Sequence, residues 1–247
     1  MTLTLLSHNA YWFQGTPSLW GEERSEAHPD VLAALIAFYR ELSPDVLCLQ
    51  EVPSRKICDE VAAGLGMRGH YARGGGRPTY GGAVLWRPLD GDVEDLTHTR
   101  IDGERIFERI CIVFTTIVNG DPLVVVNVHL SSNRYAPDRN GEPVRLAELE
   151  VLFGACAQPD VVTGDFNARP DSAVYAAMIE RGYVDCGTQL SANRRDAERR
   201  VDYLWVREAS TVRAEHMDSV PERPFALAGE PPVSLSDHPS LGVRLTW

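Results

Sequence analysis

Short apolar runs rich in β-branched residues recur along the whole 247-residue chain and limit its possible folds more than any other feature. Each run has the length and composition of a β-strand. The runs span residues 3–7, 45–50, 82–87, 110–117, 122–130, 160–166, 201–206 and 240–247. Because some of them follow one another without a helix between them, part of the sheet is expected to be antiparallel.

Helical patterns separate other runs. Residues 28–42 place apolar side chains along one face, and Pro44 then stops the helix. Residues 143–157 and 171–183 show the same pattern, so the chain is expected to form an α/β fold.

Glycine and proline concentrate in three segments, residues 68–82, 136–144 and 221–233. We interpret these as loops rather than domain boundaries, because strand-like segments resume on either side. With 44% hydrophobic residues the chain can bury a large core, and a single domain over residues 1–247 is expected.

The sequence has the features of a cytoplasmic protein. No apolar run is long enough for a membrane helix, and the first residues lack the pattern of a signal peptide. The five cysteines are scattered in apolar stretches without a CxxC pair, which indicates reduced core residues. We therefore expect a cytoplasmic monomer with no membrane partner.

A net charge of -11 disfavours a protein that coats a long polyanion. This charge is compatible with local binding of a few phosphates by arginines, such as Arg73 with Arg77 or Arg134 with Arg139. The arginine-rich run at residues 192–200 is interpreted as a solvated surface loop.

Polar side chains stand where several predicted strands begin or end. They are His8, Asn9, Glu51, Asn127, His129, Asp165, Asn167, Asp202, Asp237 and His238. Each alone has an ordinary explanation, such as a turn acceptor or a surface ion pair between Asp202 and Arg200. One polar site at a shared end of the sheets explains them all together. The two-residue spacing of Asp165 and Asn167 would place both side chains on one face of a continuing strand.

Oxygen ligands such as Asn9, Glu51 and Asp237 suit a hard cation, Mg²⁺ or Mn²⁺, that leaves room for a substrate phosphate. The sequence has no thiolate cluster or HExxH pair that would indicate zinc. A carboxylate that handles water and histidines that donate to phosphoryl oxygens complete a hydrolytic set. The residues therefore predict metal-dependent cleavage of a phosphate ester.

In chain order, these residues resemble the motifs of the endonuclease/exonuclease/phosphatase superfamily. The matching stretches are "HNAYW" at Asn9, "LQEV" at Glu51, "NVHL" at His129, "GDFN" at Asp165 and Asn167, "RRVDYLWV" at Asp202, and "SDH" at Asp237 and His238. The resemblance covers residues 5–245. It implies a DNase I-like four-layer α/β-sandwich, in which two packed mixed or antiparallel sheets are flanked by helices and the active site lies at one end.

The resemblance also implies a metal site. Glu51 would be the principal ligand of Mg²⁺ or Mn²⁺, and Asn9 would be a second ligand, direct or through water. Asp237 would lie near the metal or at a second metal position.

The catalytic roles follow from the same resemblance. Asp165 would orient or deprotonate the attacking water, and Asn167 would hold the attacked phosphate or Asp165 itself. His129 would stabilise the pentacovalent transition state. His238 would contact the scissile phosphate, with Asp202 fixing its tautomer and raising its pKa.

Substrate contacts are expected from Arg109, which resembles an arginine of the family at the start of a central strand, and from Arg134 and Tyr135. Loop aromatics could stack bases, although Trp12 and Phe13 are equally well explained as core residues. These aromatics are Tyr11, Trp12, Phe13, Trp20, Tyr71, Tyr80 and Tyr135.

The substrate class stays open between three alternatives. The preferred reading is a phosphodiesterase or nuclease, with DNA or RNA as candidate substrates. A phosphatase for a small phosphorylated metabolite is the second, and a catalytically silent relative that binds nucleic acid or protein is the third. Lipid-directed members are disfavoured, because neither an apolar membrane hairpin nor the inositol 5-phosphatase signature is present.

Overall fold

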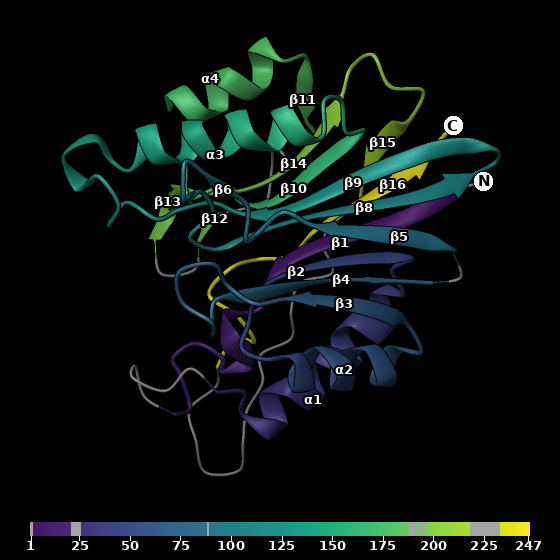
Figure 1. Cartoon of the computed structure of the whole chain (residues 1–247). Coiled ribbons are helices and arrows are strands. Elements are labelled where there is room, and N and C mark those ends of the chain that lie inside the picture. The colour runs from purple at the N-terminus through teal and green to yellow at the C-terminus, as the bar shows by residue number, and fades with distance from the viewer. Residues whose placement is uncertain (1, 21–25, 88, 188–191, 194–195, 218–232) are drawn as a thin grey trace.

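The computed structural model describes residues 2–20, 26–87, 89–187, 192–193, 196–217 and 233–247. Its strands form two six-stranded sheets, stacked one above the other (Figure 1). The first sheet has the order β15 (Arg213–His216), β16 (Leu241–Thr246), β1 (Thr2–Asn9), β2 (Val46–Val52), β4 (Gly81–Trp86) and β3 (Arg68–Ala72). The second has the order β11 (Tyr183–Asp185), β14 (Asp202–Arg207), β10 (Val161–Asp165), β9 (Asp121–His129), β8 (Ile110–Val118) and β5 (Gly91–Asp95).

Helices cover the outer face of each sheet. Helices α1 (Pro29–Leu42) and α2 (Arg55–Leu65) lie below the first sheet in Figure 1, and α3 (Glu142–Ala155) and α4 (Ala173–Glu180) lie above the second. One buried apolar cluster fills the space between the sheets, and two more fill the spaces between each sheet and its helices. The four-layer α/β-sandwich expected from the resemblance is confirmed.

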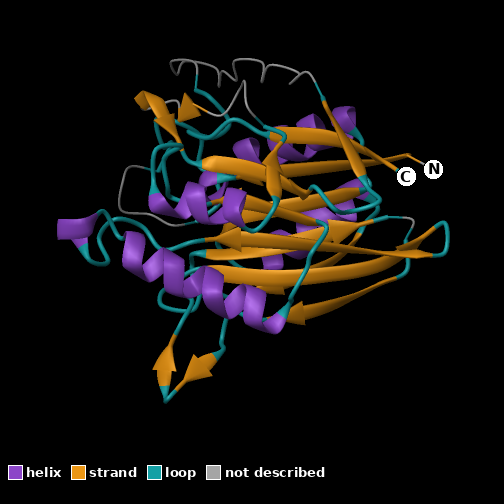
Figure 2. Cartoon of the chain, turned by 90° about the horizontal axis from the view of Figure 1, so that it is seen from above, coloured by secondary structure: helices purple, strands orange, loops and turns teal. Residues whose placement is uncertain are grey.

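Shorter elements occupy the connections. They are the 3-10 turns η1 (Tyr11–Phe13) and η2 (Pro137–Arg139), and the hairpins β6 (Arg100–Ile101) with β7 (Glu104–Arg105) and β12 (Ala192–Asn193) with β13 (Asp196–Arg200). The hairpin of β6 and β7 projects from the body of the sandwich (Figure 2). None of the described helices is both long enough and apolar enough to cross a lipid bilayer.

Parallel pairs of strands determine where the site lies. Strand β1 runs parallel to β2, and β9 runs parallel to β10, with α1 and α3 in the respective crossovers. The carboxyl ends of parallel neighbours meet at the same edge of a sheet. Both pairs end on the left side of Figure 1, so polar residues at four strand ends gather there.

The predicted loop at residues 68–82 is partly wrong, because residues 68–72 form edge strand β3 and β4 begins at Gly81. Strand β3 has exposed residues at its start, so it lacks the apolar run used to recognise strands. Helix α2 was not predicted either, although Ser54 caps its start and Gly66 ends it in a left-handed conformation. Residues 221–232 of the third predicted loop lie outside the described residues.

The cysteine prediction holds in part. No disulfide links the five cysteines, and Cys48, Cys58 and Cys111 are buried as expected. Cys156 and Cys186 are instead partly exposed, because they follow α3 and β11 at the surface rather than lying within a central strand.

Candidate active site

Three catalytic candidates lie side by side across the second sheet. The register of β9 and β10 pairs His129 with Asp165, and the register of β10 and β14 pairs Asp165 with Asp202. All three side chains are buried. The strand ends therefore bring together residues that are far apart in sequence, as the sequence predicted.

The first sheet contributes Asn9 and Glu51 from the neighbouring strands β1 and β2. The side-chain amide of Asn9 donates to Asp165 Oδ2 over 3.1 Å, which joins the two sheets at the site. The Asn9 side-chain oxygen accepts from the backbone N–H of Tyr11. This second bond fixes which end of the amide faces Asp165.

His238 reaches the site from the segment before β16. Its Nδ1 lies 2.7 Å from Asp202 Oδ2, which confirms their contact, and its Nε2 lies 3.8 Å from Asp237 Oδ1. Burial alone would lower the pKa of His238, but the nearby carboxylates, Asp202 first, raise it to about 10. At neutral pH the ring is therefore an imidazolium.

Sequence reasoning missed Ser236, which holds this segment in place. Its hydroxyl donates to the backbone oxygen of Asn9 over 2.6 Å and accepts from the backbone N–H of His238. His8, another polar residue at a strand end, lies outside the reactive group: its ring contacts the Tyr39 hydroxyl and the His238 backbone oxygen. The "SDH" motif drew attention to Asp237 and His238 and gave no indication of a role for Ser236.

Asp165 is surrounded by donors. Its Oδ1 accepts from the backbone N–H of Asn167 at 2.8 Å, and its Oδ2 lies 3.4 Å from His129 Nε2. Burial would raise the pKa of Asp165, but the imidazoles of His129 and His238 and the hydrogen bonds from Asn167 and Asn9 outweigh it and hold that pKa below its usual range. At neutral pH, where His129 is uncharged, the cation of His238 and the two hydrogen bonds remain. The carboxylate is thus ionised at neutral pH.

His129 has the opposite electrostatic character. Burial lowers its pKa to about 3, with Asp165 opposing the shift, so the ring is neutral. Its Nδ1 is buried and has no hydrogen-bond partner among the described residues. Because Nε2 faces the Asp165 carboxylate, the single ring proton lies on Nε2, and Nδ1 is an acceptor.

The strand-pleat explanation for Asp165 and Asn167 is wrong. Strand β10 ends at Asp165, and Asn167 has a left-handed backbone with φ 49°. The turn directs the Asn167 N–H to Asp165 and its side-chain amide to the backbone oxygen of Leu130, 3.0 Å away. The Asn167 backbone N–H thus contacts Asp165, and a contact of Asn167 with a substrate phosphate stays a prediction.

Glu51 occupies an irregular position in β2. It has φ 55°, and the register with β4 shifts between Gln50 and Val52 around it. The carboxylate is 8% exposed, and among the described residues nothing donates a hydrogen bond or forms an ion pair to it. Burial raises its pKa to about 8, with Arg109 opposing that shift and Asp237 adding to it.

Arg109 is a buried cation beside Glu51. Its guanidinium lies 3.4 Å from the centre of the Tyr80 ring, and Tyr80 in turn meets the edge of Trp12 at 4.7 Å. Trp12 is fixed by a hydrogen bond from its ring nitrogen to the Thr79 backbone oxygen. Tyr80 and Trp12 thus support an arginine, whereas Phe13 is fully buried in the core.

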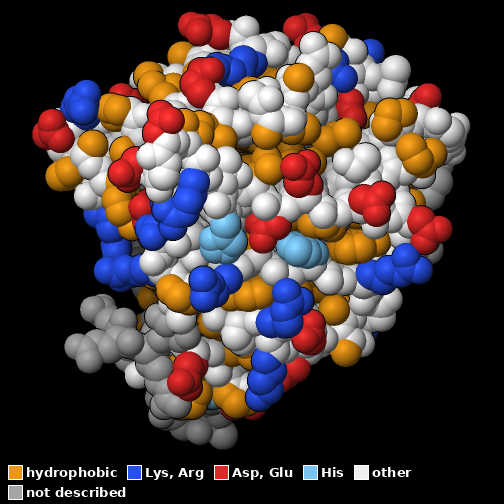
Figure 3. All heavy atoms as spheres, viewed as in Figure 1, with side chains coloured by type: hydrophobic (Ala, Val, Ile, Leu, Met, Phe, Trp, Pro, Cys, Tyr) orange, Lys and Arg blue, Asp and Glu red, His pale blue; other side chains and the backbone are white. Residues whose placement is uncertain are grey.

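Arg134 and Tyr135 lie in the loop between β9 and α3, with Arg134 exposed. Arg134 is close enough to Arg109 to contribute to the lowering of its pKa, behind burial, which is the main cause. A polar cleft of about 660 Å³ opens beside this loop, lined by Asn133, Asn167 and Arg169 among others. Lys and Arg side chains also gather on the left side of the face in Figure 3, the end where the loops project.

In the arginine-rich segment predicted as a solvated surface loop, residues 192–193 and 196–200 form the paired strands β12 and β13. Arg200 pairs with Asp185 at 2.6 Å rather than with Asp202, so the alternative ion pair is wrong. Arg194 and Arg195 lie outside the described residues.

Within the described residues, Asp165, Asp202 and His238 form a group of possible metal-ligand atoms that lie within 4.8 Å of one another. Because His238 Nδ1 is bound to Asp202 and the ring is an imidazolium, this group is suited to proton handling rather than to cation binding. The proposed ligands Asn9, Glu51 and Asp237 lie around this group. The charges of Asp237 and Asp165 both contribute to raising the pKa of Glu51.

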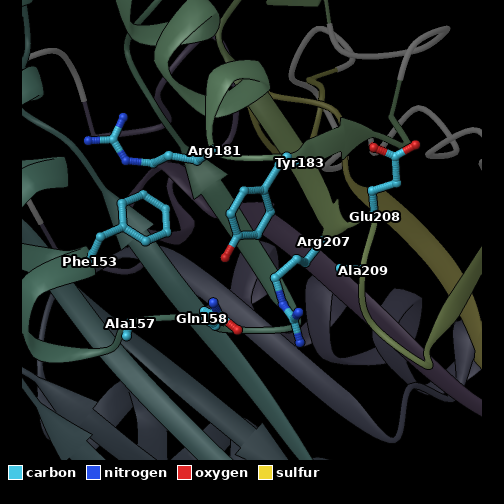
Figure 4. A pocket seen from close by; sticks show the side chains of 9 residues that line it. Phe153, Ala157, Gln158, Arg181, Tyr183, Arg207, Glu208 and Ala209 are labelled. Atoms are coloured by element: carbon cyan, nitrogen blue, oxygen red, sulfur yellow. The ribbon is translucent and has the colours of Figure 1, made fainter.

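A second cavity, of about 560 Å³, lies at the other end of β10 and β14 (Figure 4). Figure 4 shows Arg181, Tyr183 and Arg207 around it. Both arginines are already paired, Arg181 with Glu150 and Arg207 with Asp160. The cavity contains no counterpart of the Asp165 and His238 group.

Two packed sheets with flanking helices define a DNase I-like α/β-sandwich. The chain belongs to the endonuclease/exonuclease/phosphatase family, whose sequence profile matches residues 6–238. Enzymes of this family are in general hydrolases of phosphoester bonds.

Comparison with individual proteins supports this assignment. Rat protein angel homolog 1 is 26% identical over 204 residues, which are 70% of this chain and 30% of that protein. The chain thus matches only a minor part of that relative. D. rerio TDP2 complexed with single strand DNA product has a TM-score of 0.71 at 16% identity, covering 100% of this chain and 99% of the other. The human Nocturnin catalytic domain with bound sulfate has a TM-score of 0.72 at 16% identity, and the match covers 99% of this chain and 93% of the other.

Proposed function

We propose that this protein is a divalent-metal-dependent phosphodiesterase of the nuclease type. The observation that carries the proposal is the juxtaposition of ionised Asp165, neutral His129 and the Asp202–His238 pair at one sheet end. Family membership supports the bond class. The relative solved with a single-strand DNA product supports a nucleic-acid substrate.

The donor set at this end fits a hard cation. Glu51 is a buried carboxylate without a hydrogen-bond donor among the described residues, and other carboxylates lie near it. Burying such a group is unfavourable unless a cation compensates its charge. Glu51, Asn9 and Asp237 would hold Mg²⁺ or Mn²⁺, oxygen ligands being those that these ions prefer. The bound ion would neutralise charge that develops on the phosphoryl oxygens.

Asp165 is placed to handle the attacking water. Asn9 and the backbone of Asn167 each donate to one of its oxygens, which fixes the carboxylate while leaving further lone pairs for water. Because its pKa is held low, the group is ionised and can orient the water and accept its proton.

The two histidines are suited to different contacts with the phosphoryl group. His238 is an imidazolium oriented by Asp202, so its Nε2 can donate a charge-assisted hydrogen bond to a phosphoryl oxygen. His129 is neutral, and the proton on its Nε2, which lies 3.4 Å from Asp165 Oδ2, would be shared between that carboxylate and a phosphoryl oxygen. Donors fixed in place before the reaction stabilise the transition state more than mobile ones do.

Arg109 would bind the substrate phosphate. Its Nη1 is buried and has no hydrogen-bond partner among the described residues, so an anionic oxygen would satisfy it. Tyr80 orients the guanidinium by stacking, and Arg134 adds a second positive charge at the rim. These contacts favour binding of the phosphate rather than the bond-breaking step.

A panel of substrates tests the proposal. With Mg²⁺ or Mn²⁺, the protein is expected to cleave single-stranded DNA, duplex DNA with an abasic site, or RNA, and to hydrolyse bis-(p-nitrophenyl) phosphate. The Asp165→Ala variant, assayed beside it, is expected to cleave none of them. Release of inorganic phosphate from monoesters alone would replace the nuclease with a small-metabolite phosphatase. Binding without hydrolysis under any divalent metal would indicate a silent relative.

A further inference from the structure

Helix α3 buries two charged side chains that the mechanism above does not use. Arg145 is 1% exposed and Glu148 is 0% exposed. Charged residues are rarely buried so completely, and such burial is tolerated where hydrogen bonds compensate the lost water. The partners of the two side chains therefore indicate what they do.

Arg145 holds both ends of the loop that follows β9. Its Nη1 donates to the backbone oxygen of Ser131 and to the side-chain oxygen of Asn133, each at 3.0 Å. Its Nη2 donates to the backbone oxygen of Asn140. The segment between these anchors carries Arg134 and Tyr135, so the guanidinium closes the loop that presents them.

The approach of this loop to Arg145 is close. Gly141, at φ +67°, lies where an added Cβ would meet Arg145 Nη1 at 2.9 Å and the Tyr135 backbone oxygen at 2.9 Å. Only a glycine suits both the left-handed backbone and this contact. The geometry of the loop therefore depends on the position of the guanidinium.

Glu148, one turn further along α3, connects the same loop with the segment of Arg109. Its Oε2 accepts from the Ser131 N–H at 2.9 Å, and its Oε1 accepts from the Ser131 hydroxyl at 2.7 Å. The backbone N–H of Glu108, the residue before Arg109, also donates to Oε1 at 3.4 Å. One buried carboxylate thus contacts the segments of both substrate-binding arginines.

The two arginines need such support because their charges repel each other. The segments that carry them meet at Glu148, through Glu108 and Ser131, and Arg134 makes a small contribution to the lowering of the Arg109 pKa. Like charges on neighbouring segments repel each other, so holding the backbone of both segments opposes their separation. Glu148 and Arg145 supply that hold from outside the site.

We propose that Arg145 and Glu148 are positioning residues that set the spacing of Arg109 and Arg134 for the substrate phosphate. They act through the backbone of Glu108 and of the loop at residues 131–141, and they leave Asp165 and His238 untouched. Their loss is therefore expected to weaken substrate binding and to spare the chemical step.

The test compares steady-state hydrolysis of bis-(p-nitrophenyl) phosphate and of a single-stranded oligonucleotide by the full chain and its variants. Glu148→Ala is expected to raise KM about tenfold while kcat stays within about threefold, since small displacements of binding groups cost this much. Glu148→Gln, which keeps an acceptor for the Ser131 N–H, is expected to recover part of the loss. Glu150→Gln on the exposed side of α3 is the matched control and should behave as the unaltered protein.

A second pair of variants keeps the test decisive if Glu148→Ala fails to fold. Ser131→Ala removes only the hydroxyl contact to Glu148, and it should raise KM by a smaller factor. In an Arg134→Ala background the same Ser131 change should have a reduced effect on KM, because both act on one loop.

The inference rests on the proposed function, and its failure can be told apart from failure of that function. No hydrolysis by the unaltered protein would refute the phosphodiesterase itself. An active protein whose Glu148 and Ser131 variants lose thermal stability but keep KM unchanged would overturn the positioning role alone. Equal losses in kcat would also overturn it.

Discussion

His238 Nδ1 and Asp202 Oδ2 lie 2.7 Å apart in a buried pair that joins the start of β14 to the segment before β16. The contact fixes the imidazole so that its Nε2 faces Asp237 at 3.8 Å. A histidine held in this way keeps its proton at neutral pH because a carboxylate compensates its charge.

The Asp202→Asn variant should therefore lose activity while keeping its fold. An amide does not compensate the imidazolium charge, so kcat for diester hydrolysis is expected to fall about 100-fold. Asp121→Asn, which alters an exposed carboxylate at the far end of β9, is the matched control. Wild-type kcat in Asp202→Asn would show that the pair is structural.

Arg109→Lys tests the stacked guanidinium. Lysine keeps the positive charge but lacks the planar group that lies on Tyr80 and the second donor for a phosphate oxygen. KM for the diester should rise about tenfold, with a much smaller change in kcat. The exposed Arg100→Lys should leave both constants unaltered, and an unchanged KM in Arg109→Lys would argue against phosphate binding by Arg109.

Asn127 connects the two sheets behind the site, and its substitution tests how much this connection stabilises the fold. Its side-chain oxygen accepts from Gln50 Nε2 at 2.7 Å, and its amide donates to the backbone oxygens of Leu49 and Ala83. Asn127→Ala should lower the free energy of unfolding by about 3 kcal/mol, because buried polar groups lose partners. Denaturant unfolding beside the exposed control Gln158→Ala measures this; equal stability of the two variants would contradict it.

Glu148 should make stability depend on pH. Burial raises the pKa of Glu148 from 4.5 to about 7 in the folded protein. Between pH 4.5 and 7, the Glu148 carboxyl is therefore protonated in the folded state and ionised in the unfolded state. The stabilisation from this difference is fully present below pH 4.5 and is lost as the pH rises through 7. The loss is at most about 3 kcal/mol.

Unfolding at pH 5 and pH 8 measures this effect against Glu148→Gln, which has no carboxyl group at that position. The unaltered protein should lose more stability between the two pH values than the variant. Equal losses of stability in the two proteins would show that burial does not raise the pKa of Glu148.

Much of this architecture was predictable because local chemistry and tertiary position agree. The β-branched runs became central strands, and the polar residues at their ends, such as Asp165 and Asp202, met because register pairs them directly. Edge strand β3 was missed because one of its faces is solvated and its residues carry no apolar run.

The unpredicted features are those where tertiary contacts override local preference. The left-handed backbone at Glu51 follows from the bulge in β2 and not from its residue type, whereas Asn167 is a residue type that adopts this conformation comparatively readily. Arg145 and Glu148 occur in a helix where charged residues are ordinarily exposed, so their burial became evident only from their loop partners.

The site is proposed to hydrolyse a phosphodiester with a divalent metal and Asp165. The most direct measurement is hydrolysis of bis-(p-nitrophenyl) phosphate after chelator treatment, with and without added Mg²⁺ or Mn²⁺, by the protein and by Asp165→Ala. The protein should be inactive without metal and active with it, and Asp165→Ala should stay inactive in both. Equal hydrolysis by Asp165→Ala, or no hydrolysis by the protein with any divalent metal, would contradict the claim.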